Sequence, residues 1–182
     1  MIYTQQEHIN MKKTLIIATI STLSFCAVAN TDFQGHRVGA GISGVTLSEG
    51  GDDLKLDSGF KLEYGYDINH IFGVNASYSM NSKSAFDLDY DFNTFKIDTD
   101  IGYAFDLGQL WLKPYGAIGL AFANEKISDR HDSLSANDTS LMIGMGVRAQ
   151  TQMGIYADLR YDMSGYDGID TDSLSFTVGY RF

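Results

Sequence analysis

The sequence predicts an all-β protein, an eight-stranded antiparallel up-and-down β-barrel that spans a membrane. Three observations indicate this fold. Apolar and polar residues alternate along eight segments, tight connections between these segments alternate with longer ones, and the chain ends on an aromatic strand. The composition agrees, because 19 glycines, 11 tyrosines and 11 phenylalanines accompany a single proline.

The last predicted strand, residues 172–182, is the clearest of the eight. Every second residue from Leu174 to Phe182 is apolar, and the residues between them are small or polar. A soluble protein seldom ends on such a strand, because an unpaired aromatic edge promotes aggregation. In a closed barrel the last strand pairs on both sides, and its apolar face meets lipid.

The other strands show the same two-residue period with different clarity. In chain order, strands are predicted at residues 35–47, 54–66, 72–80, 95–105, 110–122, 141–149, 155–163 and 172–182. The first and the fifth are the weakest. Tyr115 in the fifth falls on the face opposite to its apolar neighbours, so the sequence leaves the inward half of that strand open.

The connections between the strands differ in length at the two rims. Tight turns are predicted near residues 67–70, 106–109 and 151–153, and longer polar loops near 48–53, 81–91, 123–138 and 164–171. This alternation is typical of outer-membrane barrels, in which the short turns are periplasmic. Aromatic residues near the periplasmic rim suit an interfacial girdle, namely Tyr64, Tyr66, Tyr103, Phe105, Trp111, Tyr180 and Phe182.

The amino-terminal segment predicts export. The basic residues Lys12 and Lys13 precede an apolar run and an A-x-A motif, which indicates a signal peptide at residues 1–29 that is cleaved after Ala29. The barrel domain is then residues 30–182, which contain no cysteine and twice as many acidic as basic residues. This composition argues against disulfide chemistry and against nucleic acid as a partner.

An exported soluble barrel of the lipocalin type is the alternative fold, because alternation alone does not reveal which face is inside. The polar faces are rich in glycine, serine and alanine, as a narrow interior requires. The apolar faces carry aromatic residues at their ends, and the chain finishes on Phe182. These observations favour the membrane barrel.

The polar faces of the second, fourth, sixth, seventh and eighth predicted strands carry six basic and six acidic residues. Side chains fill an eight-stranded barrel, and a buried charge has to be paired. We therefore predict a structural ion network that plugs the lumen and leaves negligible conductance. Its predicted members are Lys55, Asp57, Lys61, Glu63, Lys96, Asp98, Asp100, Arg148, Asp158, Arg160, Asp162 and Arg181. The alternative is a narrow porin for very small solutes, with these charges as a selectivity filter.

The excess of acidic residues falls in the four longer loops, which carry thirteen acids against three bases. Such a rim repels polyanions, and divalent cations could bridge it to the phosphates of lipopolysaccharide. The acidic runs at residues 87–91 and 167–172 are the densest, and the second resembles an incomplete calcium loop. A solvated acidic rim is the favoured interpretation, and no metal site is assigned.

One residue pair suggests an enzymatic alternative, a lipid A-modifying barrel. His131 and Ser133 have the His-x-Ser spacing used by outer-membrane lipid A deacylases. Those enzymes place the pair on a lipid-facing strand with a carboxylate further along, whereas here it falls in a polar loop and residue twelve beyond Ser133 is Met145. We therefore expect no enzymatic activity, no catalytic residue and no cofactor.

The ending from Val178 to Phe182 resembles the carboxyl terminus of small outer-membrane barrels of the OmpX/Ail type, within the porin family or outer membrane protein beta-barrel domain proteins. The resemblance implies a monomer in the outer membrane, with Val178, Tyr180 and Phe182 as the signal for the barrel-assembly machinery. Members of that family act as adhesins, in serum resistance or as structural membrane proteins. The acidic loops of this chain argue against adhesion to the host matrix or to heparin-like glycans.

Overall fold

The computed structural model describes residues 33–49, 52–85, 88–128, 133–166 and 169–182, and the predicted signal peptide lies outside this part of the chain. The described residues form strands joined by turns, and they include no helix long and apolar enough to cross a membrane. The strands are β1 (Gly35–Glu49), β2 (Asp52–Lys55), β3 (Gly59–Asp67), β4 (Phe72–Ala85), β5 (Leu88–Gly102), β6 (Phe105–Asp106), β7 (Leu110–Ser128), β8 (Ser133–Thr151), β9 (Ile155–Tyr166) and β10 (Ile169–Arg181).

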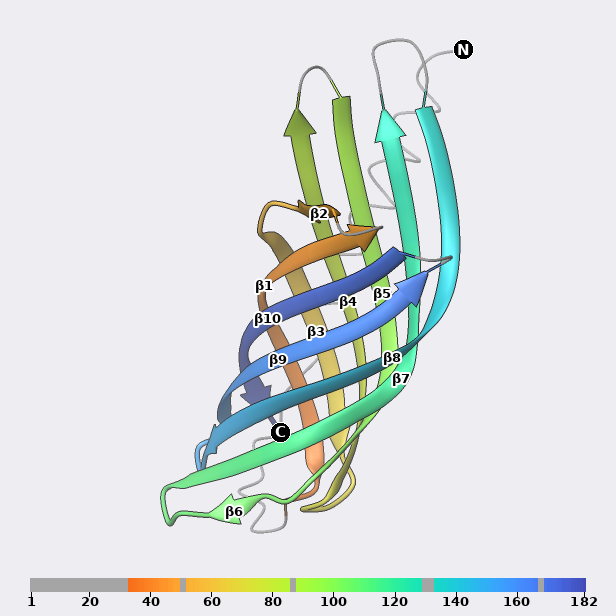
Figure 1. Ribbon diagram of the computed structural model, residues 1–182. Coiled ribbons are helices and arrows are strands. Elements are labelled where there is room, and N and C mark those ends of the chain that lie inside the picture. Colours follow the sequence, from red (N-terminus) through yellow and green to blue (C-terminus); the bar gives the residue numbers. More distant parts are fainter. Residues whose placement is uncertain (1–32, 50–51, 86–87, 129–132, 167–168) are drawn as a thin grey trace, which may run out of the picture.

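Eight of these strands form a closed antiparallel barrel, which confirms the predicted fold class (Figure 1). Each barrel strand pairs with its neighbour along the chain, while β2 and β6 are short additions to β1 and β7. The barrel closes where β1 pairs with β10, from Arg37 opposite Arg181 to Ser48 opposite Asp170. A closed barrel has no free sheet edge within the bilayer, so its backbone groups are all paired there.

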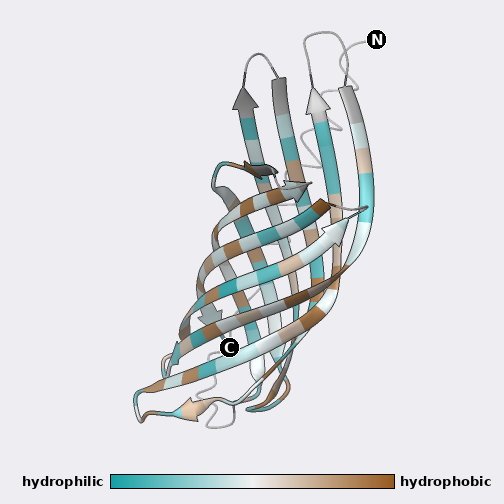
Figure 2. Ribbon diagram, in the orientation of Figure 1, coloured by the Kyte–Doolittle hydropathy of each residue, from teal (hydrophilic) through white to brown (hydrophobic). Residues whose placement is uncertain are grey.

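The two faces of the barrel differ as the alternation predicts. Outward-facing side chains are large, apolar and exposed, as in Ile42, Leu62 and Ile143, whereas inward-facing positions are buried and mostly polar or small. Figure 2 shows this alternation of apolar and polar residues along the barrel strands. An apolar exterior around a polar interior is stable only where lipid surrounds the barrel.

The strands reach further than the sequence predicts. The β4–β5 pairing continues to Ala85 opposite Leu88, and the β7–β8 pairing continues to Ser128 opposite Ser133. The prediction of long loops at these two places is therefore wrong. Residues 81–85, 123–128 and 133–141 show no sustained apolar period by which the sequence could reveal them. In β5, by contrast, Leu88, Tyr90 and Phe92 alternate with polar residues and continue the period of the strand.

The extended parts of β4, β5, β7 and β8 form a four-stranded sheet that rises above the rest of the barrel, and we call it the projecting sheet (Figure 1). Pairing of β8 with β9 begins only at Met142, whereas β8 itself begins at Ser133. In the part of the chain that the structure describes, residues 133–141 of β8 thus pair with β7 and with no strand on their other side.

A β-bulge between β2 and β3 changes which residues face inward. Thr46 of β1 lies opposite Lys55, and Ser43 lies opposite Gly59. An advance of three residues along β1 therefore corresponds to four residues along the paired segment from Lys55 to Gly59. One extra residue reverses the faces of the strand that carries it. Leu56, which the alternation places on the apolar outer face, is therefore buried inside the barrel.

We expect the replacement of Gly41 by valine to weaken closure of the barrel. A Cβ atom at Gly41 would overlap the carbonyl oxygen of Phe176 on β10, which can yield only if β1 and β10 separate. Overpacking of this kind costs at least about 1–3 kcal/mol. The matched control is Gly44→Val, because a Cβ there has no heavy atom within 4 Å.

The measurement is the fraction of each protein that migrates as the folded, heat-modifiable species on a denaturing gel without boiling. Gly41→Val should lose most of this species, while Gly44→Val should match the unsubstituted protein. Equal folded fractions for the two variants would contradict the assignment of the β1–β10 seam as tightly packed.

Candidate functional site: the filled barrel interior

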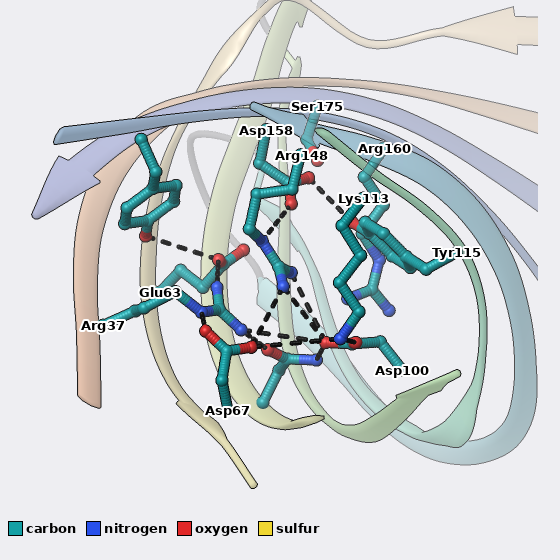
Figure 3. A network of polar contacts seen from close by, with 12 residues as sticks. Arg37, Glu63, Asp67, Asp100, Lys113, Tyr115, Arg148, Asp158, Arg160 and Ser175 are labelled. Carbon is teal, nitrogen blue, oxygen red and sulfur yellow. Dashed lines mark hydrogen bonds and ion pairs between the residues drawn. The ribbon is translucent and has the colours of Figure 1, made fainter. Parts of the chain in front are cut away.

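Twelve charged side chains project into the barrel and form one network of ion pairs and hydrogen bonds. Figure 3 shows the part of this network around Arg37, Asp100 and Arg148. The bases are Arg37, Lys61, Lys96, Lys113, Arg148 and Arg160, and the acids are Glu63, Asp67, Asp98, Asp100, Asp158 and Asp162. All are buried except Lys96, whose side chain is 12% exposed. The equal numbers of bases and acids leave the interior with no net formal charge.

Asp100 on β5 lies at the centre of the network. Its Oδ1 accepts a hydrogen bond of 2.5 Å from Lys113 Nζ, and its Oδ2 lies 3.4 Å from Arg148 Nη1 and 3.7 Å from Arg37 Nη2. Asn75 donates a further hydrogen bond of 3.0 Å to Oδ2. This single carboxylate therefore links cations from β1, β7 and β8 across the width of the barrel.

Arg37 joins the first barrel strand to the second. It lies opposite Gly65 in the β1–β3 register, so the carboxylates two residues to either side of Gly65 lie within its reach. Arg37 Nε donates to Asp67 at 2.8 Å, and Arg37 Nη1 lies 3.3 Å from Glu63. Gly65 is required here, because a Cβ would lie 2.6 Å from the Arg37 guanidinium.

A second group of ion pairs lies on β3, β5 and β9. Arg160 donates to Asp162 at 2.6 Å and to Asp98 at 2.9 Å, and Lys96 reaches Asp162 at 2.9 Å. Lys61 donates to Glu63 at 2.8 Å and to the Ser175 hydroxyl at 3.1 Å. The contacts of Arg160 with Asp98, of Lys96 with Asp162 and of Lys61 with Ser175 join strands that are not neighbours in the barrel, whereas the other two each stay within one strand.

Tyr115 settles the open question of which way β7 faces. Its side chain is buried in the interior, its hydroxyl donates to Asp158 at 2.7 Å, and the Arg148 guanidinium lies 4.9 Å from the ring centroid. Gly146 on β8 provides the space, because a Cβ there would lie 2.5 Å from the tyrosine hydroxyl. The inward-facing residues of β7 are therefore Lys113, Tyr115 and every second residue that follows them.

Nine of the twelve residues that the sequence suggests for the network lie together in these buried contacts, namely Lys61, Glu63, Lys96, Asp98, Asp100, Arg148, Asp158, Arg160 and Asp162. The prediction is wrong for Lys55 and Asp57, which are exposed, because the bulge before β3 turns them outward. Arg181 is half-buried at the periplasmic rim, with its guanidinium 5.2 Å from the ring centroid of Phe33.

Sequence reasoning missed three members of the network. Arg37 and Lys113 lie on the two weakest strands, and Asp67 had been assigned to a turn. All three occupy positions at which the alternation of their strand points the side chain inward. Extending the alternation of residues 54–66 by one residue at the periplasmic end would have found Asp67. Lys113 could have been found only by placing Tyr115 inward.

An apolar layer fills the interior on the extracellular side of the ion network. It contains Val45, Leu47, Leu56, Phe92, Ala121, Ala123, Met142 and Tyr166, all of them buried. Sequence reasoning assigned the whole interior to polar residues and missed this layer. Its members come from strand ends near the extracellular rim, where the bulge at β2–β3 turns Leu56 inward and side chains meet across the lumen.

Aromatic side chains close the periplasmic end. Phe33 is 3% exposed, and its ring stacks on His70 at 5.2 Å and meets Trp111 edge-on at 5.5 Å between centroids. The Lys113 ammonium lies 5.8 Å from the same ring, in the range of a cation–π contact. Trp111 thus faces the interior, and its assignment to the lipid-facing girdle is wrong, whereas Tyr103 remains exposed.

Some of the residues considered for other chemistry lie outside the described part of the chain. His131 and the first residues of both acidic runs are among them, so the structure gives no geometry for the His-x-Ser pair. Within the described residues, no group of three or more His, Cys, Asp or Glu side chains could hold a metal ion. The interior carboxylates are instead each engaged with a buried cation.

The closed barrel, its apolar exterior and its charge-paired interior define a small β-barrel protein of the bacterial outer membrane. The chain belongs to the family described as "Outer membrane protein beta-barrel domain", which matches residues 15–182.

A relative of known identity is the attachment invasion locus protein of Yersinia enterocolitica, which is 29% identical over 94% of this chain and all of its own length. The crystal structure of Ail from Yersinia pestis covers 82% of this chain and 100% of its own, with 25% identity and a TM-score of 0.63. Neisserial surface protein A, at 19% identity, covers 81% of this chain and 97% of its own with a TM-score of 0.67, which shows a common fold.

Replacing Lys113 by methionine should destabilise the barrel strongly. The substitution removes the closest cation of Asp100 and leaves a buried carboxylate incompletely paired. Breaking a buried pair from one side costs about 3–5 kcal/mol. The control is Lys55→Met, since Lys55 is exposed and such surface substitutions stay within about 0.5 kcal/mol.

Urea unfolding of the refolded proteins in detergent, followed by the fluorescence of Trp111, measures both effects. A Lys113→Met protein as stable as the unsubstituted barrel would show that the network contributes little. An equally large loss from Lys55→Met would place that residue inside the network after all.

Proposed function

We propose that this protein is a non-conducting, non-enzymatic barrel that displays the projecting sheet at the cell surface, where it binds another molecule. The observation that carries the proposal is the contrast between the two halves of the molecule. The part within the membrane is filled by paired charges and an apolar layer, whereas β4, β5, β7 and β8 continue well beyond it.

The filling of the lumen supports the absence of transport. Cations as long as Arg37, Arg148 and Arg160 cross the interior and are held by carboxylates on opposite walls. Opening a path would require these pairs to separate, and each separated charge costs several kcal/mol. The apolar layer above and Phe33 below add two further seals in series.

The edge of the projecting sheet supports a binding role. Residues 133–141 of β8 have one paired side in the described structure, and an edge of this kind can accept a further strand by backbone hydrogen bonding. Natural edges are usually protected by charges or proline, but this segment contains one charged residue, Asp138, and no proline. Such an edge suits an extended segment of another protein.

The charge of the projecting sheet and its connecting loops favours some classes of binding partner over others. Residues 81–91 and 123–138 carry seven acids and three bases. On the same sheet, burial and the neighbouring Glu125 carboxylate raise the pKa of Tyr90, so this tyrosine stays neutral and hydrogen-bonded. Ail from Yersinia pestis forms a complex with the heparin analogue sucrose octasulfate. The acidic balance here instead favours a neutral or basic protein segment over a sulfated polyanion.

The same acidic rim suits divalent cations that bridge to lipopolysaccharide, and we propose a monomer in contact with that lipid. We also propose that Val178, Tyr180 and Phe182 direct insertion by the barrel-assembly machinery. In the folded protein, Phe182 and His36 exchange two backbone hydrogen bonds of 2.9 Å and stack their rings, so the terminal residue also fastens the seam.

Planar-bilayer recordings separate this proposal from the alternative of a narrow porin. The purified protein should give no large, long-lived openings, because the network spans the lumen. A general porin reconstituted under the same conditions provides the positive control. Reproducible single-channel steps would favour the porin.

Unchanged lipid A acylation in cells with and without the gene, measured by mass spectrometry, would remove the enzymatic alternative.

Shortening the projecting sheet should abolish surface binding and leave the barrel intact. Residues 124–137 are replaced by an Asn-Gly turn, which joins the strands at Ala123 opposite Asp138 and removes the outer part of the open β8 edge. Cells that display this variant should adhere to epithelial cells no better than cells without the protein.

The control carries Lys55→Ala and Asp57→Ala, two exposed residues at the same rim but outside the projecting sheet. It should adhere like the unsubstituted protein. Undiminished adhesion of the shortened variant, with normal heat-modifiable migration, would contradict the proposed role of the sheet.

A further inference from the structure

The outer face of the barrel contains a groove of about 580 Å³ over β7, β8 and β9. Pro114 and Gly116 of β7 form its floor. Met145 and Leu159, which are 58% and 52% exposed, form two of its walls together with Tyr161. The groove follows the register of the sheet, because Gly116 lies opposite Met145 and Met145 lies opposite Tyr161.

Two features of β7 produce this depression. Gly116 projects no side chain, and a Cβ there would meet only the Gly144 carbonyl oxygen, at 3.9 Å. Pro114 lies between the last β5–β7 pair, Gly102 with Tyr115, and the first β6–β7 pair, at Leu112. A proline is tolerated at this interruption because it has no N–H to offer a neighbouring strand.

The surroundings of the groove identify its occupant. Its rim consists of exposed apolar side chains such as Ile101, Val147 and Leu174, which continue into the lipid-facing surface of the barrel. In an outer-membrane protein this surface lies in the hydrocarbon region of the bilayer, where acyl chains are the available ligand. The groove is open along its length to this hydrocarbon, so an acyl chain can lie in it.

The position of the groove floor along β7 indicates which leaflet of the outer membrane supplies the lipid. Ile101 and Gly116 are paired one residue before the end of β5 at Gly102, where the chain enters the periplasmic turn region that contains β6. The floor is therefore nearer to the periplasmic rim than to the projecting sheet. Lipid from the periplasmic leaflet, which is phospholipid, enters this end of the groove directly.

We infer that the groove over Pro114 and Gly116 is a binding site for an acyl chain of a phospholipid from the periplasmic leaflet. The acyl chain occupies the space that a side chain at Gly116 would fill, and it packs against Met145, Val147 and Leu159. The site would give the barrel a lipid that stays bound while the rest of the surrounding lipid exchanges. This inference is independent of the proposed role of the projecting sheet.

Native mass spectrometry of the full-length protein tests the site. The protein is extracted in a mild detergent and titrated with phosphatidylethanolamine, and the number of retained lipids is counted. The unsubstituted barrel should retain one. Gly116→Leu fills the floor and should lower retention about tenfold, the change expected when about two fewer methylene groups are buried. Ala76→Leu adds similar bulk to the lipid-facing side of β4, outside the groove, and should leave retention unchanged.

Each remaining outcome contradicts the inference. These outcomes are no retained phospholipid in the unsubstituted protein, equal retention in Gly116→Leu, preferential retention of lipid A in competition, and a dimer that Gly116→Leu abolishes. Heat-modifiable migration checks the fold of each variant. If Gly116→Leu does not fold, Met145→Ala, which lowers one wall, has to show the loss of retention instead.

Discussion

The pairing of buried charges inside the closed barrel is the constraint on which the rest of the structure depends. Asp100 contacts cations from three different strands, and none of these contacts forms unless β1, β7 and β8 are in register. An unpaired charge in this interior would cost more than most single packing contacts provide. Register, closure and charge pairing therefore stabilise one another, and the network fixes the relative positions of strands far apart in the sequence.

Side-chain volume follows from the same constraint. A narrow barrel holds long side chains only where the facing positions are small. Gly65 faces Arg37, and Gly146 faces Tyr115. Where the large residue of β7 points inward, its neighbour Gly116 leaves the outer face hollow. The internal network and the external groove are thus two consequences of how β7 distributes its bulk between the two faces.

We propose that the molecule divides its functions along the membrane normal. The lower barrel is closed by paired charges and by Phe33, the apolar layer seals the upper interior, and neither part resembles a transport path. The projecting sheet begins above this filled region. Its strands continue those of the barrel, so a rigid base holds an open strand edge at the cell surface, which suits recognition of another protein.

The amino-acid sequence predicts the eight strands, the outward apolar face and nine members of the ion network, because a period of two fixes which residues share a face. It could not determine the position of Lys55 and Leu56, since a bulge of one residue reverses the faces and leaves the composition unchanged. Nor could it reveal the apolar layer, the Phe33 closure or the projecting sheet. These depend on which strands meet across the lumen and how far pairing continues in water, and only the tertiary structure decides both.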